Sequence, residues 1–172
     1  MSRLPSPCRG ILGVFLLGPA AACFDSATDP DFDYDPQVIE ETQFAASLGI
    51  DLSEMTENQF GVYTQDLTVG DGTVVENGTE FSVNYTGWLS SGLEFDSGTL
   101  DPSTHQFGIP YKIGAGDVIP GFEIGLLGMQ PGGTRRFIIP PELGYGAQAV
   151  GPIPRGSILI FEVELLTAFT DF

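Results

Sequence analysis

Few residue types in this sequence could carry covalent or metal chemistry. His105 is the one histidine of the chain, in a stretch rich in Pro, Ser and Thr that we expect to be an exposed loop, which disfavours a Ser-His-Asp triad. One histidine and two cysteines are too few for a zinc site built from these ligands. Gly114, Gly116 and Gly121 do not have the spacing of a dinucleotide-binding loop, and no Gly-Lys-Ser/Thr phosphate loop occurs. We therefore expect no metal and no cofactor.

A set of aromatic side chains on separate segments could instead enclose an apolar pocket. The set comprises Tyr85, Phe95, either Phe107 or Tyr111, Phe122, Tyr145 and Phe161. Taken alone, such residues most often belong to a hydrophobic core. The segments that carry them, and the sequence around them, must decide between a core and a pocket.

The expected secondary structure places these residues mainly on strands. Alternating or bounded apolar runs predict strands over residues 63–69, 81–86, 106–113, 134–140 and 158–166. A helix of about two or three turns is predicted from Pro120 to just before Gly128, and another short helix within residues 38–48. The 23 Gly and 13 Pro among 172 residues make turns frequent, so an α+β fold with one core is favoured over a helical bundle.

Six blocks of sequence resemble the FKBP family of peptidyl-prolyl isomerases. They are Val83–Leu89 (VNYTGWL), Gly92–Ser97 (GLEFDS), Ile113–Glu123 (IGAGDVIPGFE), Gly128-Met129, Pro140–Ala147 (PPELGYGA) and Leu159–Leu165 (LIFEVEL). Their order and spacing follow the family from about residue 61 to residue 167. The resemblance implies a twisted antiparallel β-sheet half-wrapped around one short α-helix, with a pocket between them.

The resemblance also implies roles for individual residues. The residues that match catalytic positions of the family are Tyr85, Phe95, Asp96, Ile119 and Tyr145. Those that match substrate-binding positions are Val118, Phe122, Ile153, Phe161 and Phe107. Phe122 would form the floor of the pocket, where many family members have Trp.

The chemistry implied by the resemblance suits an aromatic pocket without a cofactor. The barrier of ~18–20 kcal/mol to rotation of a peptide bond comes from amide resonance, and the planar amide is the more polar, better hydrated form. A dry pocket disfavours that form relative to the twisted one. The expected activity is therefore cis-trans isomerisation of X-Pro bonds. The alternative is a non-catalytic module or holdase chaperone that grips Pro-containing segments in the same pocket.

Two departures from the family lie between residues 99 and 110. This segment contains no Arg or Lys to pair with Asp96, whose role is therefore open between an electrostatic one and support of the pocket wall. The segment is also irregular enough that either Phe107 or Ile109 could occupy the aromatic position of the pocket.

Charge and family resemblance together define the expected partners. The net charge of −17 argues against binding nucleic acid through a basic surface. Proline-containing polypeptides are the expected substrates, and macrolide inhibitors of the rapamycin type are possible ligands. We expect a monomer, with a dimer formed through residues 37–60 as the alternative.

The N-terminal residues predict export. In residues 1–22, two arginines precede the apolar run Ile11–Leu17 and small residues follow it, as in a secretory signal peptide. Cys23 lies where a bacterial lipoprotein carries its lipidated cysteine, although Ala20 replaces the usual Leu. The alternatives are a lipid anchor on Cys23, which would hold the protein at a membrane of the cell envelope, or cleavage after Ala22 that leaves a free thiol.

The rest of the chain divides into two predicted parts. Residues 23–60 are expected to form an acidic linker, because residues 24–60 hold ten acidic residues and no basic one. Residues 61–172 are expected to form the isomerase domain.

Overall fold

The computed structural model describes residues 34–106 and 108–170. The predicted signal peptide over residues 1–22, the lipidation site Cys23 and the pocket candidate Phe107 lie outside the described residues. Within the described ranges, no helix combines the length and the apolar composition needed to cross a bilayer.

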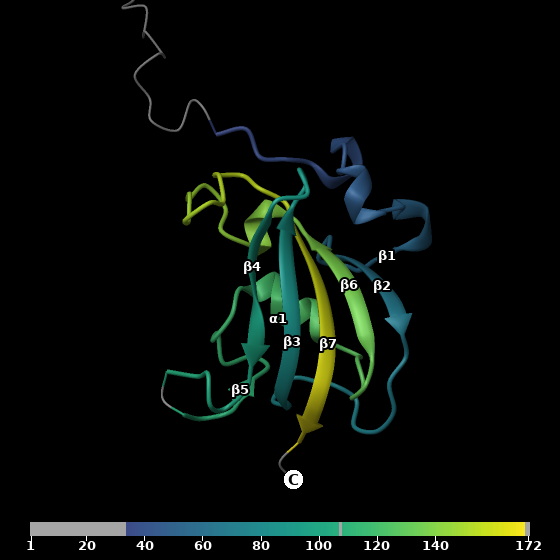
Figure 1. Ribbon diagram of the computed structural model, residues 1–172, viewed down its shortest axis with the longest axis vertical. Helices are drawn as coiled ribbons and strands as arrows, with labels where there is room; N and C mark the ends of the chain where they lie inside the picture. The colour runs from purple at the N-terminus through teal and green to yellow at the C-terminus, as the bar shows by residue number, and fades with distance from the viewer. Residues whose placement is uncertain (1–33, 107, 171–172) are drawn as a thin grey trace, which may run out of the picture. The chain divides into compact units, whose positions relative to one another are not determined.

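The described residues form an antiparallel sheet of seven strands. The strands are β1 Thr56–Glu57, β2 Tyr63–Thr68, β3 Glu80–Leu89, β4 Glu94–Leu100, β5 Tyr111–Lys112, β6 Thr134–Ile139 and β7 Leu159–Phe169. Their order is β1-β2-β6-β7-β3-β4, and the short β5 also pairs with β3. The two longest strands, β3 and β7, lie side by side, whereas β4 pairs with β3 alone and is an edge of the sheet (Figure 1).

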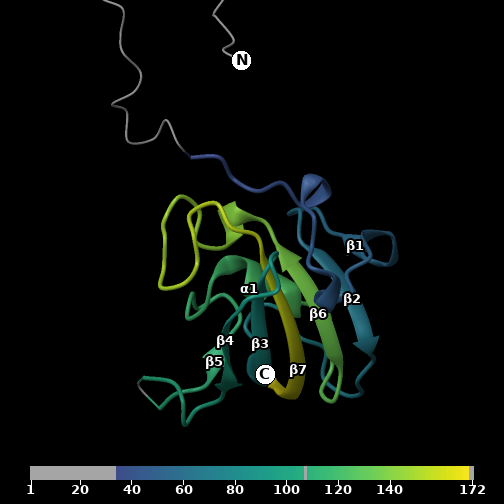
Figure 2. The ribbon, with the colours of Figure 1, turned by 45° about the horizontal axis from the view of Figure 1, so that its top comes forward.

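The helix α1, Pro120–Leu126, covers one face of this sheet. Pro120 occupies its first turn, where the missing N–H of proline costs nothing. Gly125 allows the close approach, since a Cβ atom there would lie 2.7 Å from the ring of Phe137 on β6. Figures 1 and 2 both show α1 passing behind β3 and β7. The predicted α+β class, an antiparallel sheet with one short helix, is confirmed for the described residues.

Alternation along β7 divides the residues between the two faces as predicted. Phe161 and Val163 are buried on the face toward α1, while Glu164 is exposed on the other. The predicted strands over 63–69, 81–86 and 134–140 correspond to β2, β3 and β6.

The predicted strand over residues 106–113 is mostly wrong. Of its described residues, only Tyr111 and Lys112 are in a strand, and residues 102–106 before it fold into turns. The Asp101 carboxylate accepts hydrogen bonds from the backbone N–H groups of Ser103 and Thr104, which closes a local turn instead of a sheet pairing.

The strand β4 has no counterpart among the predicted strands, and its pairing contains a bulge. Gly87 of β3 pairs with Asp96 and Trp88 pairs with Glu94, so Phe95 is an extra residue on β4. A polar, glycine-containing edge strand of this kind lacks the alternation that would reveal it.

Residues 34–60 differ most from the prediction. The helix expected within 38–48 is replaced by the 3₁₀ turns Ile39–Glu41 and Ala46–Leu48. A third 3₁₀ turn, Leu52–Glu54, follows before β1. The buried Ile39 packs with Ile138, Ile158 and Ile160 on the face of the sheet opposite α1.

Hydrogen bonds also attach this segment to the sheet. Gln37 donates its N–H to the carbonyl of Gly156 at 2.8 Å, and its side-chain oxygen accepts the N–H of Ile158 at 2.9 Å. Arg136 donates to the carbonyl of Leu48 at 3.0 Å. The described part of the predicted linker, residues 34–60, therefore belongs to the same compact unit as the sheet, and the boundary expected at residue 60 is misplaced.

Candidate active site

A pocket of about 170 Å³ opens between α1, β3, β4 and β7. Its lining consists of Tyr85, Phe95, Asp96, Leu100, Asp117, Val118, Ile119, Phe122, Tyr145 and Phe161. Tyr85 comes from β3, Phe161 from β7 and Phe122 from α1. Tyr145 follows the 3₁₀ turn Pro141–Leu143. Residues far apart in the sequence thus meet at one cavity.

The inner end of the pocket is a cluster of rings packed edge to face. Phe161 lies 5.1 Å from Phe122 and 5.5 Å from Phe95 between ring centroids, with both pairs nearly perpendicular. Tyr85 meets Phe122 edge-on at 5.9 Å. These rings pack favourably against one another, and together they give the pocket an apolar inner wall.

Gly87 makes room for this arrangement. A Cβ atom at Gly87 would lie 2.7 Å from the ring of Phe95 and 2.8 Å from the ring of Phe161. The bulge on β4 lies opposite Gly87, and it allows the consecutive residues Phe95 and Asp96 both to line the pocket.

The phenols of Tyr85 and Tyr145 and the carboxylates of Asp96 and Asp117 provide polar groups at the pocket. The Tyr85 hydroxyl donates to Asp96 at 2.8 Å. Burial raises the pKa of Tyr85 well above its usual value, and the hydrogen bond to Asp96 raises it further. Burial, together with the negative charge of Asp96, also raises the pKa of Tyr145. Both phenols are therefore neutral hydrogen-bond donors at physiological pH.

A backbone donor lies at the rim. Ile119 precedes the first turn of α1 with extended backbone angles, and its N–H has no acceptor within the described residues. Its carbonyl accepts the N–H groups of Phe122 and Glu123 instead. A free N–H beside an apolar hollow can bind a carbonyl oxygen of a peptide.

The structure gathers eight of the residues singled out from the sequence around this pocket: Tyr85, Phe95, Asp96, Val118, Ile119, Phe122, Tyr145 and Phe161. Ile153 does not line it, since its side chain is 4% exposed and packs in the main core. Ile109, the alternative to Phe107, is 50% exposed and also absent from the lining. Tyr111 is buried against Phe81 in the core.

Sequence reasoning missed two lining residues, Leu100 and Asp117. Asp117 directly precedes Val118, which was predicted to bind substrate, so its position in the chain was the available signal. Leu100 is the last residue of β4, the strand that was not predicted.

The environment of His105 also differs from the prediction. It was expected on the surface, but its side chain is 4% exposed. Its ring packs edge-on against Tyr111 at 4.7 Å, and Nε2 lies 3.3 Å from Oδ1 of Asp117. In residues 34–106 and 108–170, no group of three or more His, Cys, Asp and Glu residues is arranged to hold a metal ion.

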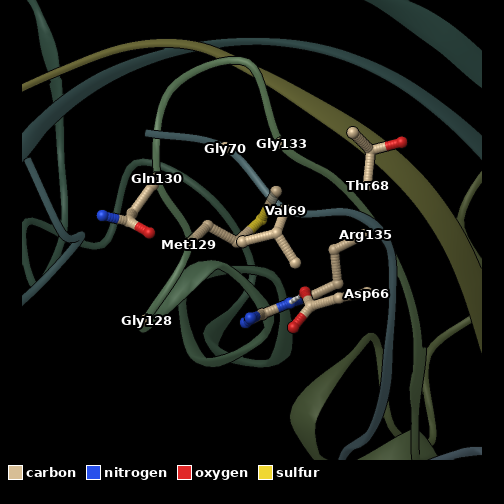
Figure 3. A pocket seen from close by; sticks show the side chains of 9 residues that line it. All are labelled: Asp66, Thr68, Val69, Gly70, Gly128, Met129, Gln130, Gly133 and Arg135. Carbon is tan, nitrogen blue, oxygen red and sulfur yellow. Dashed lines mark hydrogen bonds and ion pairs between the residues drawn. The ribbon is translucent and has the colours of Figure 1, made fainter. Parts of the chain in front are cut away.

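A second cavity, of about 20 Å³, lies beside Asp66 and Arg135, and its polar contacts serve the fold. Figure 3 shows Arg135 beside Asp66 at its edge, and Nε of Arg135 donates to that carboxylate at 2.6 Å. Arg135 also donates to the carbonyls of Gly125 and Leu127 at the end of α1. These bonds fix the helix to β2 and β6, and the volume is too small for more than about one water molecule.

Comparison with known proteins connects this pocket to a family. The family described as FKBP-type peptidyl-prolyl cis-trans isomerase matches residues 71–166, which is more than half of the chain. The FK506-binding protein of Neisseria meningitidis serogroup B is 44% identical, over 63% of this chain and 97% of the relative. Peptidyl-prolyl cis-trans isomerase FKBP15-3 of Arabidopsis thaliana is 41% identical, over 74% of this chain and 87% of the relative.

Other matches concern only part of a longer relative or the fold itself. This chain spans 24% and 21% of two fungal relatives, FK506-binding protein 3 of Candida albicans and FK506-binding protein 4 of Chaetomium thermophilum. The crystal structure of FkpA from Escherichia coli superposes with a TM-score of 0.57 at 31% identity, covering 73% of this chain and 55% of that one. Sequence match, sheet topology and pocket agree, and the chain belongs to the FKBP-type peptidyl-prolyl cis-trans isomerase family.

Proposed function

We propose that this protein accelerates cis-trans isomerisation of X-Pro bonds in polypeptides. The observation that carries the proposal is the pocket of perpendicular rings, which combines an apolar hollow with the Ile119 N–H and two neutral phenols. The arrangement suits a proline ring with its flanking amides.

The mechanism requires only these groups. A proline ring between Phe95, Phe122 and Phe161 would leave the preceding amide in a dry environment, which disfavours its polar planar form. The Ile119 N–H and the Tyr145 hydroxyl would orient substrate carbonyls as the bond rotates. No proton needs to leave either tyrosine, which agrees with their raised pKa values.

Asp96 would act through Tyr85 and through its own charge. No cation of the described residues pairs with its carboxylate, which accepts a hydrogen bond from the Tyr85 hydroxyl at 2.8 Å. In this site Asp96 would hold the Tyr85 ring at the wall, and its negative charge would face the rotating amide.

The test is the cis-to-trans rate of a short peptide series in which the residue before Pro varies. The full chain is compared with Phe95→Ala, Tyr145→Phe and the control Phe60→Ala, which removes a half-exposed ring outside the pocket. We expect acceleration by the wild-type protein and by the control, and loss of about tenfold or more in both pocket variants. A rapamycin-type macrolide should block the wild-type rate.

Binding of the peptides without any acceleration would contradict this function. It would assign the protein to the second class, a Pro-binding module or holdase, which the same pocket could serve.

We also propose that the protein is exported and anchored to an envelope membrane by a lipid on Cys23, as residues 1–23 suggest. Mass spectrometry of the N-terminal peptide tests this, because a free Cys23 thiol would refute the lipid anchor.

A further inference from the structure

His105 is buried although the loop that carries it is not. Its neighbours Pro102, Ser103, Thr104 and Gln106 are exposed, while the His105 side chain is 4% exposed. The turn closed by Asp101 directs it inward, since the His105 N–H donates to the Asp101 carbonyl at 3.2 Å. A buried titratable side chain on an exposed loop requires a reason, and the proposed reaction does not use it directly.

The contacts of His105 connect three parts of the molecule. The ring packs edge-on against Tyr111 of β5, and Tyr111 packs against Phe81 of β3 in the core. On its other side, Nε2 of His105 faces the Asp117 carboxylate at 3.3 Å. Asp117 lines the pocket, two residues before the Ile119 N–H.

Residues 114–119, which carry Asp117 and Ile119 at the pocket, depend on side-chain contacts for their position. Residues 114–119 contain no helix or strand, and Gly114 and Gly116 both have positive φ angles, 88° and 78°. The Gly116 N–H donates to Glu123 at 3.1 Å, which ties the first half of the segment to α1. For the second half, the contact with His105 is the one polar side-chain contact of Asp117 within the described residues.

We propose that His105 is a positioning residue of the pocket. By holding Asp117 against the core, it fixes the direction of the Ile119 N–H and therefore the binding of the substrate carbonyl. This inference rests on the proposed prolyl-binding function of the same pocket. His105 itself does not touch the substrate.

The expected effect falls on substrate binding. A carbonyl held by Ile119 is held in both the planar and the twisted state of the peptide, so losing the alignment should raise KM and leave kcat nearly unchanged. Loss of the 3.3 Å contact between Nε2 of His105 and the Asp117 carboxylate is expected to raise KM for a Leu-Pro peptide by up to about tenfold.

Matched variants separate positioning from packing. His105→Gln places an amide nitrogen near the former Nε2 and should restore most of the wild-type KM. His105→Asn has the same chemistry but is one bond shorter, so it should not reach Asp117 and should show the full rise. The unfolding midpoint of each variant is measured in parallel, and equal midpoints for Gln and Asn with different KM values support positioning.

A double-mutant cycle with Asp117→Ala completes the test. If His105 acts through Asp117, His105→Asn should have no further effect in the Asp117→Ala background. Additive effects, or equal KM values for His105→Gln and His105→Asn, would overturn the inference. If the wild-type protein binds the peptide without accelerating its isomerisation, the proposed activity fails, but the same cycle read as peptide Kd still tests His105.

Discussion

Neighbouring residues of β6 and β7 point to opposite faces of the sheet, and the two faces differ in what covers them. On β6, Phe137 faces α1 and Ile138 faces the other side, and on β7 Phe161 and Ile160 are divided in the same way. The aromatic face retains a pocket of about 170 Å³, whereas the isoleucine face is covered by the segment that contains Ile39. The rings of the aromatic face meet nearly at right angles around this pocket, while the isoleucine side chains of the other face pack with one another and with Ile39.

The comparison predicts that stability and activity can be changed separately. Ile138→Ala removes a fully buried side chain from the isoleucine face and should lower the free energy of unfolding by about 2–5 kcal/mol. Isomerase activity per folded molecule should be retained, because Ile138 does not line the pocket. Denaturant unfolding and kcat/KM measured on the same sample check this. A parallel loss of kcat/KM would show that the two faces are coupled.

Gly87→Ala is expected to act on the aromatic face. The new Cβ would meet the rings of Phe95 and Phe161, so the rings must move into the pocket, at a cost of about 1–3 kcal/mol in stability. We expect kcat/KM to fall by at least about tenfold. The matched control is Gly98→Ala on β4, where a Cβ would lie at an ordinary 3.7 Å from Tyr85. Similar activities for both variants would contradict the role assigned to Gly87.

Gln37→Ala tests how firmly the covering segment is held. It leaves the N–H of the fully buried Ile158 without its acceptor and should cost about 1–2 kcal/mol of unfolding free energy, with activity unchanged. The control is Gln59→Ala, an exposed glutamine without such a contact. Equal stability of the two variants would show that this hydrogen bond is not needed.

The smallest expected effect is a shift in the titration of Tyr85. Its pKa is raised, so its neutral form stabilises the fold at pH values below the ordinary tyrosine pKa of 10, and this contribution is lost only as pH rises through the higher folded value. Ultraviolet titration of the wild-type protein against Tyr85→Phe isolates this group. In Asp96→Asn the pKa of Tyr85 should fall toward 10 but remain above it, because burial is the larger cause. An unchanged titration curve would exclude a contribution from Asp96.

Regular elements with local signals could be predicted from the sequence. Pro120 and Gly128 mark the limits of α1, and the alternation from Leu159 to Leu165 gives both the strand β7 and its buried face. Most of the pocket residues followed from six family-like blocks, since composition alone would have assigned the same rings to the core.

The features that were missed depend on contacts distant in the chain. A strict alternation would place Phe95 and Asp96 on opposite faces, and only the bulge opposite Gly87 brings both to the pocket. His105 is polar and lies among turn-forming residues, so its burial follows from Tyr111 and Asp117 and not from its own neighbours. The apolar side chains within residues 38–48 predicted a helix, but they pack on the sheet from short 3₁₀ turns, whose conformation depends on that packing.

The edge position of β4 means that one wall of the pocket is held to the sheet from one side alone. β4 is bonded to β3 alone, is interrupted by a bulge and carries Phe95 and Asp96, whereas Phe161 lies on β7, which is bonded to both β3 and β6. Local opening in proteins begins where few hydrogen bonds hold a segment. Amide protons of β4 should therefore exchange with solvent earlier than those of β7, and transient separation of this one strand would admit bulky residues beside a proline while the rest of the sheet stays folded.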